Sequence, residues 1–119
     1  MTTCSEGKVH DLILASTSPY RRQQLKQLGV RFAACSPLVE EVCQEGESPV
    51  NFALRMAEAK AKAVAAQYPD AWVVGADQVC EFQGDIIRKP GSHEIATAQL
   101  STFSGKQVLF HSALSVTHF

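Results

Sequence analysis

The hydrophobic positions of the chain begin with a short continuous run, Leu12–Ala15, followed by a segment with helical periodicity. A run of this length predicts a buried strand, and the periodic segment predicts an amphipathic helix. Ser18 is a good N-cap, Pro19 suits the first helical position, and Gly29 suits the stop. Residues 31–35 predict a second short strand. The tight link between helix and strand favours a parallel, right-handed crossover.

A second helix is predicted after an acidic, turn-rich loop. Ser48-Pro49 repeats the cap-then-proline signal, and the helix is expected to run to about Gln67. Lys60 and Lys62 point in different directions, so one can face a cleft while the other is solvated. The apolar positions fall on one alanine-rich stripe, which lets a helix approach a neighbour closely: Ala53, Leu54, Ala57, Ala61, Val64 and Ala65.

The clearest strand covers residues 71–76, which are continuous and apolar and therefore typical of a central strand. Asp77 and Gln78 are expected to interrupt it before a further extended segment at residues 79–82.

The last third of the chain predicts a hairpin, a helix and a strand. Residues 83–85 form a hairpin turn signal before a return strand at residues 86–87. Ser92 can cap a third helix over residues 93–102, and residues 107–117 predict a final strand. The whole pattern predicts an α/β fold with a mixed, partly parallel sheet flanked by helices.

Groups that bind phosphate gather between the first strand and the first helix. Two hydroxyls and two guanidiniums meet the free N–H groups of a helix N-terminus there, from Ser16, Ser18, Arg21 and Arg22. Such groups form an anion site. An ordinary capped helix with two solvated arginines is an equally good interpretation of this segment alone, because any helix N-terminus offers the same N–H groups.

Two acidic positions are candidates for catalysis or metal binding. Asp77 emerges from an apolar strand, where an unpaired carboxylate is costly to bury, so a metal, a lysine or backbone N–H groups are expected beside it. It can act as a general base or metal ligand, or else cap a turn. Glu40 and Glu41 lie in a loop, where adjacent carboxylates suit a hard cation or simply form a solvated acidic segment.

Two lysines are further candidates for phosphate binding. Lys89 precedes Pro90, which holds the lysine backbone extended. Lys60 is the weaker candidate, because helical lysines are mostly solvated. Together, these cations and carboxylates fit phosphoanhydride hydrolysis, in which charge is positioned around a phosphoryl group and a divalent cation.

Composition excludes several other classes of function. The 119 residues suit one domain, and a net charge of −1 gives no bulk attraction to nucleic acid or to a membrane. Residues 1–10 are polar, lack the apolar core of a signal peptide, and are expected to form a disordered lead-in. The sequence has no P-loop, dinucleotide fingerprint, nucleophile elbow or zinc-ligand spacing. Its four cysteines are expected to be free thiols in a reducing cytoplasm, with a disulfide as the less favoured alternative.

Several motifs occur in the order in which a known family carries them. They are Leu12–Ala15 with the following Ser16-Thr17-Ser18-Pro19-Tyr20-Arg21-Arg22, Val39-Glu40-Glu41, Lys60-Ala61, Gly75-Ala76-Asp77-Gln78-Val79, Lys89-Pro90 and Ser104-Gly105. On these motifs, nearly the whole chain from Leu12 onward resembles the Maf family of nucleoside triphosphate pyrophosphatases. The resemblance implies a Maf-like domain over residues 11–119 with the Maf/ITPase-like N-terminal lobe.

The resemblance also implies an activity, which is hydrolysis of a nucleotide to its monophosphate and pyrophosphate with a divalent cation, Mg²⁺ or Mn²⁺. In the family's pattern Asp77 is the general base, and Glu41 contacts the metal or the activated water. The phosphate site is lined by Ser16, Arg21, Lys60 and Lys89. The expected partner is a nucleotide, not a nucleic-acid polymer or a membrane, and a homodimer is left open.

Two positions separate branches of the family. Tyr20 and Gln78 stand where the branch that acts on dTTP and UTP usually has Arg and Thr, and they resemble the branch that acts on 7-methyl-GTP. An aromatic face attracts a cationic methylated guanine, and a glutamine offers both a donor and an acceptor to a base edge.

The chain also departs from the family's pattern. Glu40 replaces an Asp, Arg88 replaces a Gly, and residues 110–113 lack the usual Thr-Gly. Family members continue into a second lobe that closes the cleft, so this chain is expected to be one lobe of such an enzyme. The alternatives are a truncated homologue that binds nucleotide or a partner chain without turnover, and a pyrophosphatase acting on dTTP or UTP.

Overall fold

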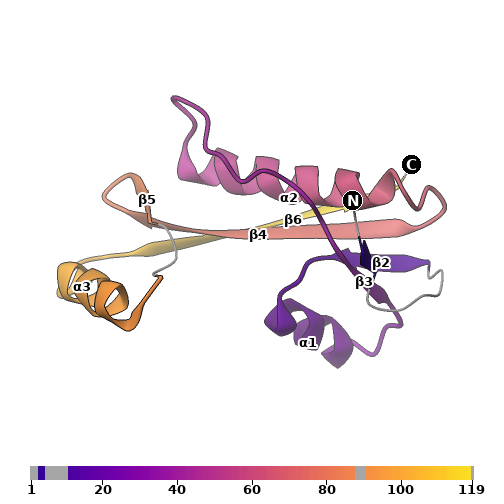
Figure 1. Cartoon of the computed structure of the whole chain (residues 1–119), viewed down its shortest axis with the longest axis horizontal. Helices are drawn as coiled ribbons and strands as arrows, with labels where there is room; N and C mark the ends of the chain where they lie inside the picture. Colours follow the sequence, from indigo (N-terminus) through magenta and orange to yellow (C-terminus); the bar gives the residue numbers. More distant parts are fainter. Residues whose placement is uncertain (1–2, 5–10, 88–90, 119) are drawn as a thin grey trace.

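A computed structural model describes residues 3–4, 11–87 and 91–118 of the chain. The described residues form a six-stranded sheet and three helices (Figure 1). The strands are β1 (Thr3–Cys4), β2 (Leu12–Ala15), β3 (Ala33–Ser36), β4 (Trp72–Phe82), β5 (Asp85–Ile87) and β6 (Leu109–Thr117). The helices are α1 (Pro19–Gln27), α2 (Pro49–Ala65) and α3 (His93–Phe103).

The sheet is mixed, and its parallel part is the predicted strand–helix–strand unit. β2 pairs in parallel with β3 on one side and with β4 on the other. β1, β5 and β6 add antiparallel pairs, β1 to β3 and the other two to β4. The expected α/β class with a partly parallel sheet flanked by helices is therefore confirmed.

Each helix starts at its predicted cap. The Ser18, Ser48 and Ser92 hydroxyl oxygens accept hydrogen bonds from the backbone N–H three residues later, at 3.3, 3.1 and 3.2 Å. Pro19 and Pro49 occupy the first helical positions of α1 and α2. These caps satisfy N–H groups that the helices themselves leave free, so they set where each helix begins.

The core lies between α2 and the sheet. Residues of β4 with odd numbers face α2, and Val73 and Val79 belong to its two apolar clusters. A Cβ at Gly75 would lie 2.1 Å from the Ala57 carbonyl oxygen and 2.6 Å from the Ala61 amide nitrogen. The alanine-rich stripe therefore does allow a close approach, and glycine is required on the facing strand.

The helical periodicity predicts the wrong environment for one residue of that stripe. Leu54 is exposed, whereas Phe52 and Met56 are buried core residues of α2. The face of α2 that packs on the sheet is rotated slightly from the predicted face, because Ala57 and Ala61 contact Gly75.

The expected break at Asp77-Gln78 does not occur. β4 runs without interruption through both residues, since β6 pairs with it continuously from Val73 to Glu81. The pairing supplies ladder hydrogen bonds that outweigh the weak strand preference of Asp. At the end of β4, Gln83 and Gly84 have φ angles of 52° and 86°, the positive values that a two-residue hairpin turn requires.

The expectation of free thiols is wrong for one cysteine. Cys43 and Cys80 are free, but Cys35 is disulfide-bonded. The backbone of Cys4 lies opposite Cys35 in the β1–β3 ladder, an arrangement that the sequence separation does not reveal. Of the expected lead-in over residues 1–10, Thr3–Cys4 is a strand and the other eight residues lie outside the described part.

α1 and α3 lie on the side of the sheet away from α2 (Figure 1). The Phe82 ring of β4 meets the Phe103 ring of α3 there, with centroids 4.8 Å apart. Neither helix contributes a buried residue. In the described chain, none of the helices is both long and apolar enough to cross a membrane.

Replacing Gly75 with alanine is expected to destabilise the fold by roughly 3 kcal/mol, because the new methyl group overlaps the backbone of α2. Urea unfolding measures the change. Gly91→Ala is the matched control, since a Cβ there meets nothing within 4 Å. Equal unfolding midpoints for the two variants would contradict the close helix–strand contact.

Candidate functional site

Three charged side chains from separate parts of the fold meet above β4. The Lys60 Nζ atom of α2 lies 3.0 Å from Asp77 Oδ1 and 2.9 Å from Glu41 Oε1. The Lys60 and Asp77 side chains are 15% and 10% exposed, whereas that of Glu41 is 57% exposed. The Lys60–Asp77 ion pair is therefore mostly buried, and Glu41 is the member of the cluster that solvent reaches.

The close helix–strand contact brings these groups together. Lys60 precedes Ala61, which contacts Gly75, and Asp77 follows Gly75 by two residues on the same face of β4. Glu41 comes from the loop between β3 and α2. Lys62 points away and pairs with Glu58 at the surface, so the two lysines divide as expected.

Electrostatics keep Lys60 charged. Burial disfavours its ammonium form, but hydrogen bonds to Glu41 and Asp77 outweigh this, so the pKa of Lys60 is raised. The Lys60 ammonium therefore stays positively charged and can attract a phosphate. It contacts Asp77 and Glu41 through one oxygen each, so each carboxylate has a second oxygen that can accept a hydrogen bond or bind a cation.

The candidate phosphate-binding residues follow the end of β2 in the chain. Ser16 is buried, and its Oγ atom accepts a hydrogen bond of 3.1 Å from the Ser18 N–H. Arg21 and Arg22 are half-buried, and within the described residues neither guanidinium has an ion-pair partner. Tyr20 is 82% exposed. Lys89 lies outside the described residues, so its position relative to this group is not part of the structure.

Among the described residues, which leave out residues 88–90 after β5, the pairing of β4 has a gap next to the end of β2. β6 occupies one edge of β4 along residues 73–81, so β2 and β5 share the other edge. β2 pairing ends at Gly75 and β5 pairing begins at Cys80. Asp77 and Gln78 lie within the gap and point to opposite faces, Asp77 toward α2 and Gln78 into solvent on the far face.

Two carboxylates of this cluster have the chemistry to hold a divalent cation together with phosphate oxygens. Across the described ranges, no three His, Cys, Asp or Glu side chains gather to hold a metal ion. Asp77 and Glu41 do lie on the same ammonium group. Mg²⁺ is commonly held by one or two carboxylates with phosphate oxygens completing its shell, and Glu41, as the exposed member, is accessible to it.

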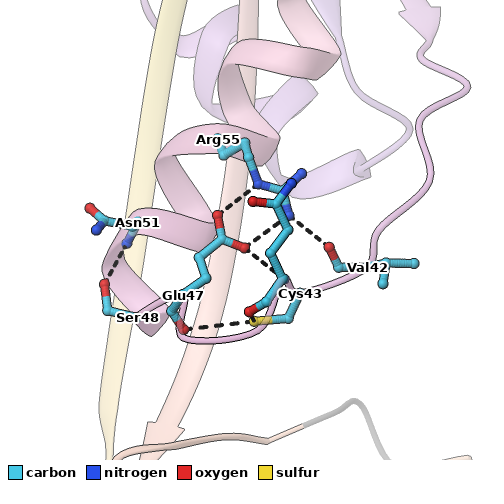
Figure 2. A network of polar contacts seen from close by, with 7 residues as sticks. Val42, Cys43, Glu47, Ser48, Asn51 and Arg55 are labelled. Carbon is cyan, nitrogen blue, oxygen red and sulfur yellow. Dashed lines mark hydrogen bonds and ion pairs between the residues drawn. The ribbon is translucent and has the colours of Figure 1, made fainter.

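A polar network at the loop before α2 was not predicted (Figure 2). Glu47 binds Arg55 through two hydrogen bonds, and Arg55 also donates to the Val42 carbonyl oxygen. The only available signal was a carboxylate before the helix cap and an arginine two turns into the helix, a spacing too common to identify a contact.

Comparison with known proteins places this arrangement in a family. The family described as "Maf-like protein" matches residues 11–119. The chain belongs to the Maf family.

Similar curated Maf relatives carry one shared name. A 7-methyl-GTP pyrophosphatase of Albidiferax ferrireducens is 49% identical over 112 residues, covering 94% of this chain and 56% of that protein. Proteins of the same name from Xanthomonas axonopodis pv. citri and Bordetella parapertussis are 50% and 53% identical, covering 88% and 89% of the chain. These alignments cover 55% and 53% of the two relatives, so the chain spans about half the length of the relatives it matches.

Replacing Lys60 with methionine is expected to destabilise the fold by about 3–5 kcal/mol, because Asp77 then remains buried without its cation. Urea unfolding measures the loss, and adding Asp77→Asn to the same chain recovers part of it. Lys62→Met, which breaks the exposed pair with Glu58, leaves the midpoint nearly unchanged. A Lys60 variant as stable as the parent chain would contradict the buried pair.

Proposed function

We propose that this Maf chain takes part in hydrolysing a nucleoside triphosphate, with 7-methyl-GTP as the favoured substrate, to the monophosphate and pyrophosphate. The observation that carries the proposal is the Lys60 ammonium held between Asp77 and Glu41. Asp77 lies two residues beyond Gly75, which pairs with Ala15, the residue before Ser16 at the end of β2. The names of the curated relatives support the same reaction.

In this proposal Asp77 is the general base. Its Oδ1 atom is held by Lys60, and its second oxygen accepts a proton from the attacking water as the bond between the α and β phosphates breaks. Lys60 orients the carboxylate and adds positive charge close to the reacting phosphate. Glu41 holds the divalent cation, Mg²⁺ or Mn²⁺, or the activated water. When bound, the cation neutralises phosphate charge.

The phosphates are proposed to lie at the start of α1. The Ser16 and Ser18 hydroxyls can donate to phosphate oxygens, and Arg21 and Arg22 offer guanidiniums that have no ion-pair partner among the described residues. Lys89 is proposed to join them from the segment after β5.

The base is proposed to be read at the far face of β4. Tyr20 is exposed at the first turn of α1, and Gln78 is exposed on the face opposite Asp77. A substrate in the pairing gap of β4 could therefore reach the base-reading residues on one face and the water-activating residue on the other.

The compartment and assembly belong to the same proposal. We propose the cytoplasm as the compartment because a nucleotide is the proposed substrate. The cysteines do not support this assignment, because Cys35 is disulfide-bonded. A homodimer is the assembly that we propose to test by light scattering.

A second candidate is binding of nucleotide without turnover. It is favoured by the burial of Asp77 and its ion pair with Lys60, which limit the access of water to the carboxylate. Turnover in the same chain decides between the two.

Pyrophosphate release with Mn²⁺ is expected from 7-methyl-GTP in preference to dTTP or UTP. Asp77→Asn is expected to lower kcat by about 10²–10⁴ because it removes the base, while calorimetry shows nucleotide binding within a few-fold of the parent chain. Asp70→Asn, at an exposed turn before β4, is the matched control and keeps full activity. Binding without turnover in the parent chain would favour the second candidate, and preference for dTTP or UTP would contradict the proposed substrate.

Replacing Tyr20 with leucine is expected to weaken binding of 7-methyl-GTP about tenfold, through loss of the aromatic face that attracts the cationic base. GTP lacks that positive charge, so its affinity should change far less. Calorimetry with both nucleotides measures the difference. An equal loss for both would remove Tyr20 from base recognition.

A further inference from the structure

The loop that carries Glu41 has little regular structure to hold it in place. It connects β3, which ends at Ser36, to α2, which begins at Pro49, and contains no helix or strand. Glu41 itself is exposed, and so is Val42. Val39 and Cys43, on either side of Glu41, pack against the apolar cluster that includes Phe52 and Met56 of α2. Apolar packing is not directional, so the Glu41 carboxylate is oriented toward Lys60 only if a polar contact also fixes the backbone beside it.

Arg55 provides that attachment. Its Nε and Nη2 atoms lie 2.7 and 2.9 Å from the two carboxylate oxygens of Glu47, and Nη2 also lies 2.7 Å from the Val42 carbonyl oxygen. A planar guanidinium can donate to both groups at once, whereas a lysine ammonium lacks this fork geometry. Figure 2 shows Arg55 reaching from the helix to Glu47 on one side and to Val42 on the other.

Glu47 completes the attachment from the loop side. Its side chain is 10% exposed, and its Oε1 atom also accepts a 3.0 Å hydrogen bond from the Gln44 N–H. The hydrogen bond from Arg55, together with that from the Gln44 backbone, lowers the pKa of Glu47 to about 2. The carboxylate therefore stays charged throughout the neutral range.

Val42 adjoins Glu41, and Arg55 and Lys60 belong to the same rigid helix. Next to the Glu47–Arg55 pair, two further polar contacts thus hold the loop to α2, from Arg55 to the Val42 carbonyl and from Lys60 to the Glu41 carboxylate. The geometry points to Arg55 as a positioning residue that acts through Glu47 and Val42 to hold the Glu41 carboxylate against Lys60. The link to catalysis rests on the proposed function, which assigns Glu41 to the cation or the water.

The test observes the Lys60 ammonium group directly, in the nitrogen–proton NMR spectrum of lysine side chains, without nucleotide or metal. Glu41→Gln is expected to shift or broaden the Lys60 signal, since it replaces the charged partner. Arg55→Met should reproduce that change and add nothing in the Glu41→Gln background. Arg55→Lys, which keeps the charge and the helix, should give a partial change and serves if Arg55→Met fails to fold.

Hydrogen exchange of the same variants distinguishes local release from general destabilisation. The Gln44 and Glu47 amides, which are hydrogen-bonded within the loop, should exchange at least about tenfold faster in Arg55→Met, while amides of the β4–β6 ladder stay unchanged. Lys62→Met, on the same helix but paired with Glu58, is the control and should alter neither measurement.

An unchanged Lys60 signal in the arginine variants, or equal acceleration of loop and ladder amides, overturns the positioning role. Failure of the proposed function would show instead as absence of nucleotide binding and turnover in the parent chain. The NMR and exchange measurements need no nucleotide, so they can still be interpreted after that result. Failure of the positioning role and failure of the proposed function are therefore distinguishable.

Discussion

At Gly75 the backbone of α2 comes so close to β4 that only a hydrogen atom fits between them. Ala57 and Ala61 make this contact, and Lys60 is carried with Ala61 onto the face of β4 where Asp77 lies. The pair is largely buried, so its geometry depends on how far the helix stands from the strand. The candidate site is thus set by a packing constraint between small residues, before any charge is considered.

β4 also places two candidate residues, Asp77 and Gln78, on opposite faces of the sheet. β6 occupies one edge of β4, and among the described residues the opposite edge is unpaired between β2 and β5, where Asp77 and Gln78 lie. Alternation along a strand sends these adjacent side chains in opposite directions. Residues suited to activate water and residues suited to read a base can therefore border one opening while remaining separate from each other.

The core of the described chain lies mainly on the α2 side of the sheet. On the far side, α1 and α3 bury no residue, and Phe110, Leu114 and Val116 of β6 are exposed. The loop before α2 is held both by polar contacts to Arg55 and by Val39 and Cys43, which pack against the apolar cluster on the α2 side. The Lys60–Asp77 side of the candidate site accordingly rests on a well-packed helix, α2, whereas the proposed phosphate-binding side rests on α1, which buries no residue.

Local sequence signals determined where elements begin and what they are. Ser-Pro pairs predicted the starts of α1 and α2, continuous apolar runs predicted β2 and most of β4, and ordered motifs indicated the Maf family. These signals depend on neighbours within a few residues, which a sequence displays directly. Only the tertiary structure decided that β4 continues through Asp77, that Cys35 is disulfide-bonded, and that Arg55 holds the loop of Glu41. Each depends on a partner distant in sequence or on another element's position, because strand pairing and ion pairing are set by packing in three dimensions.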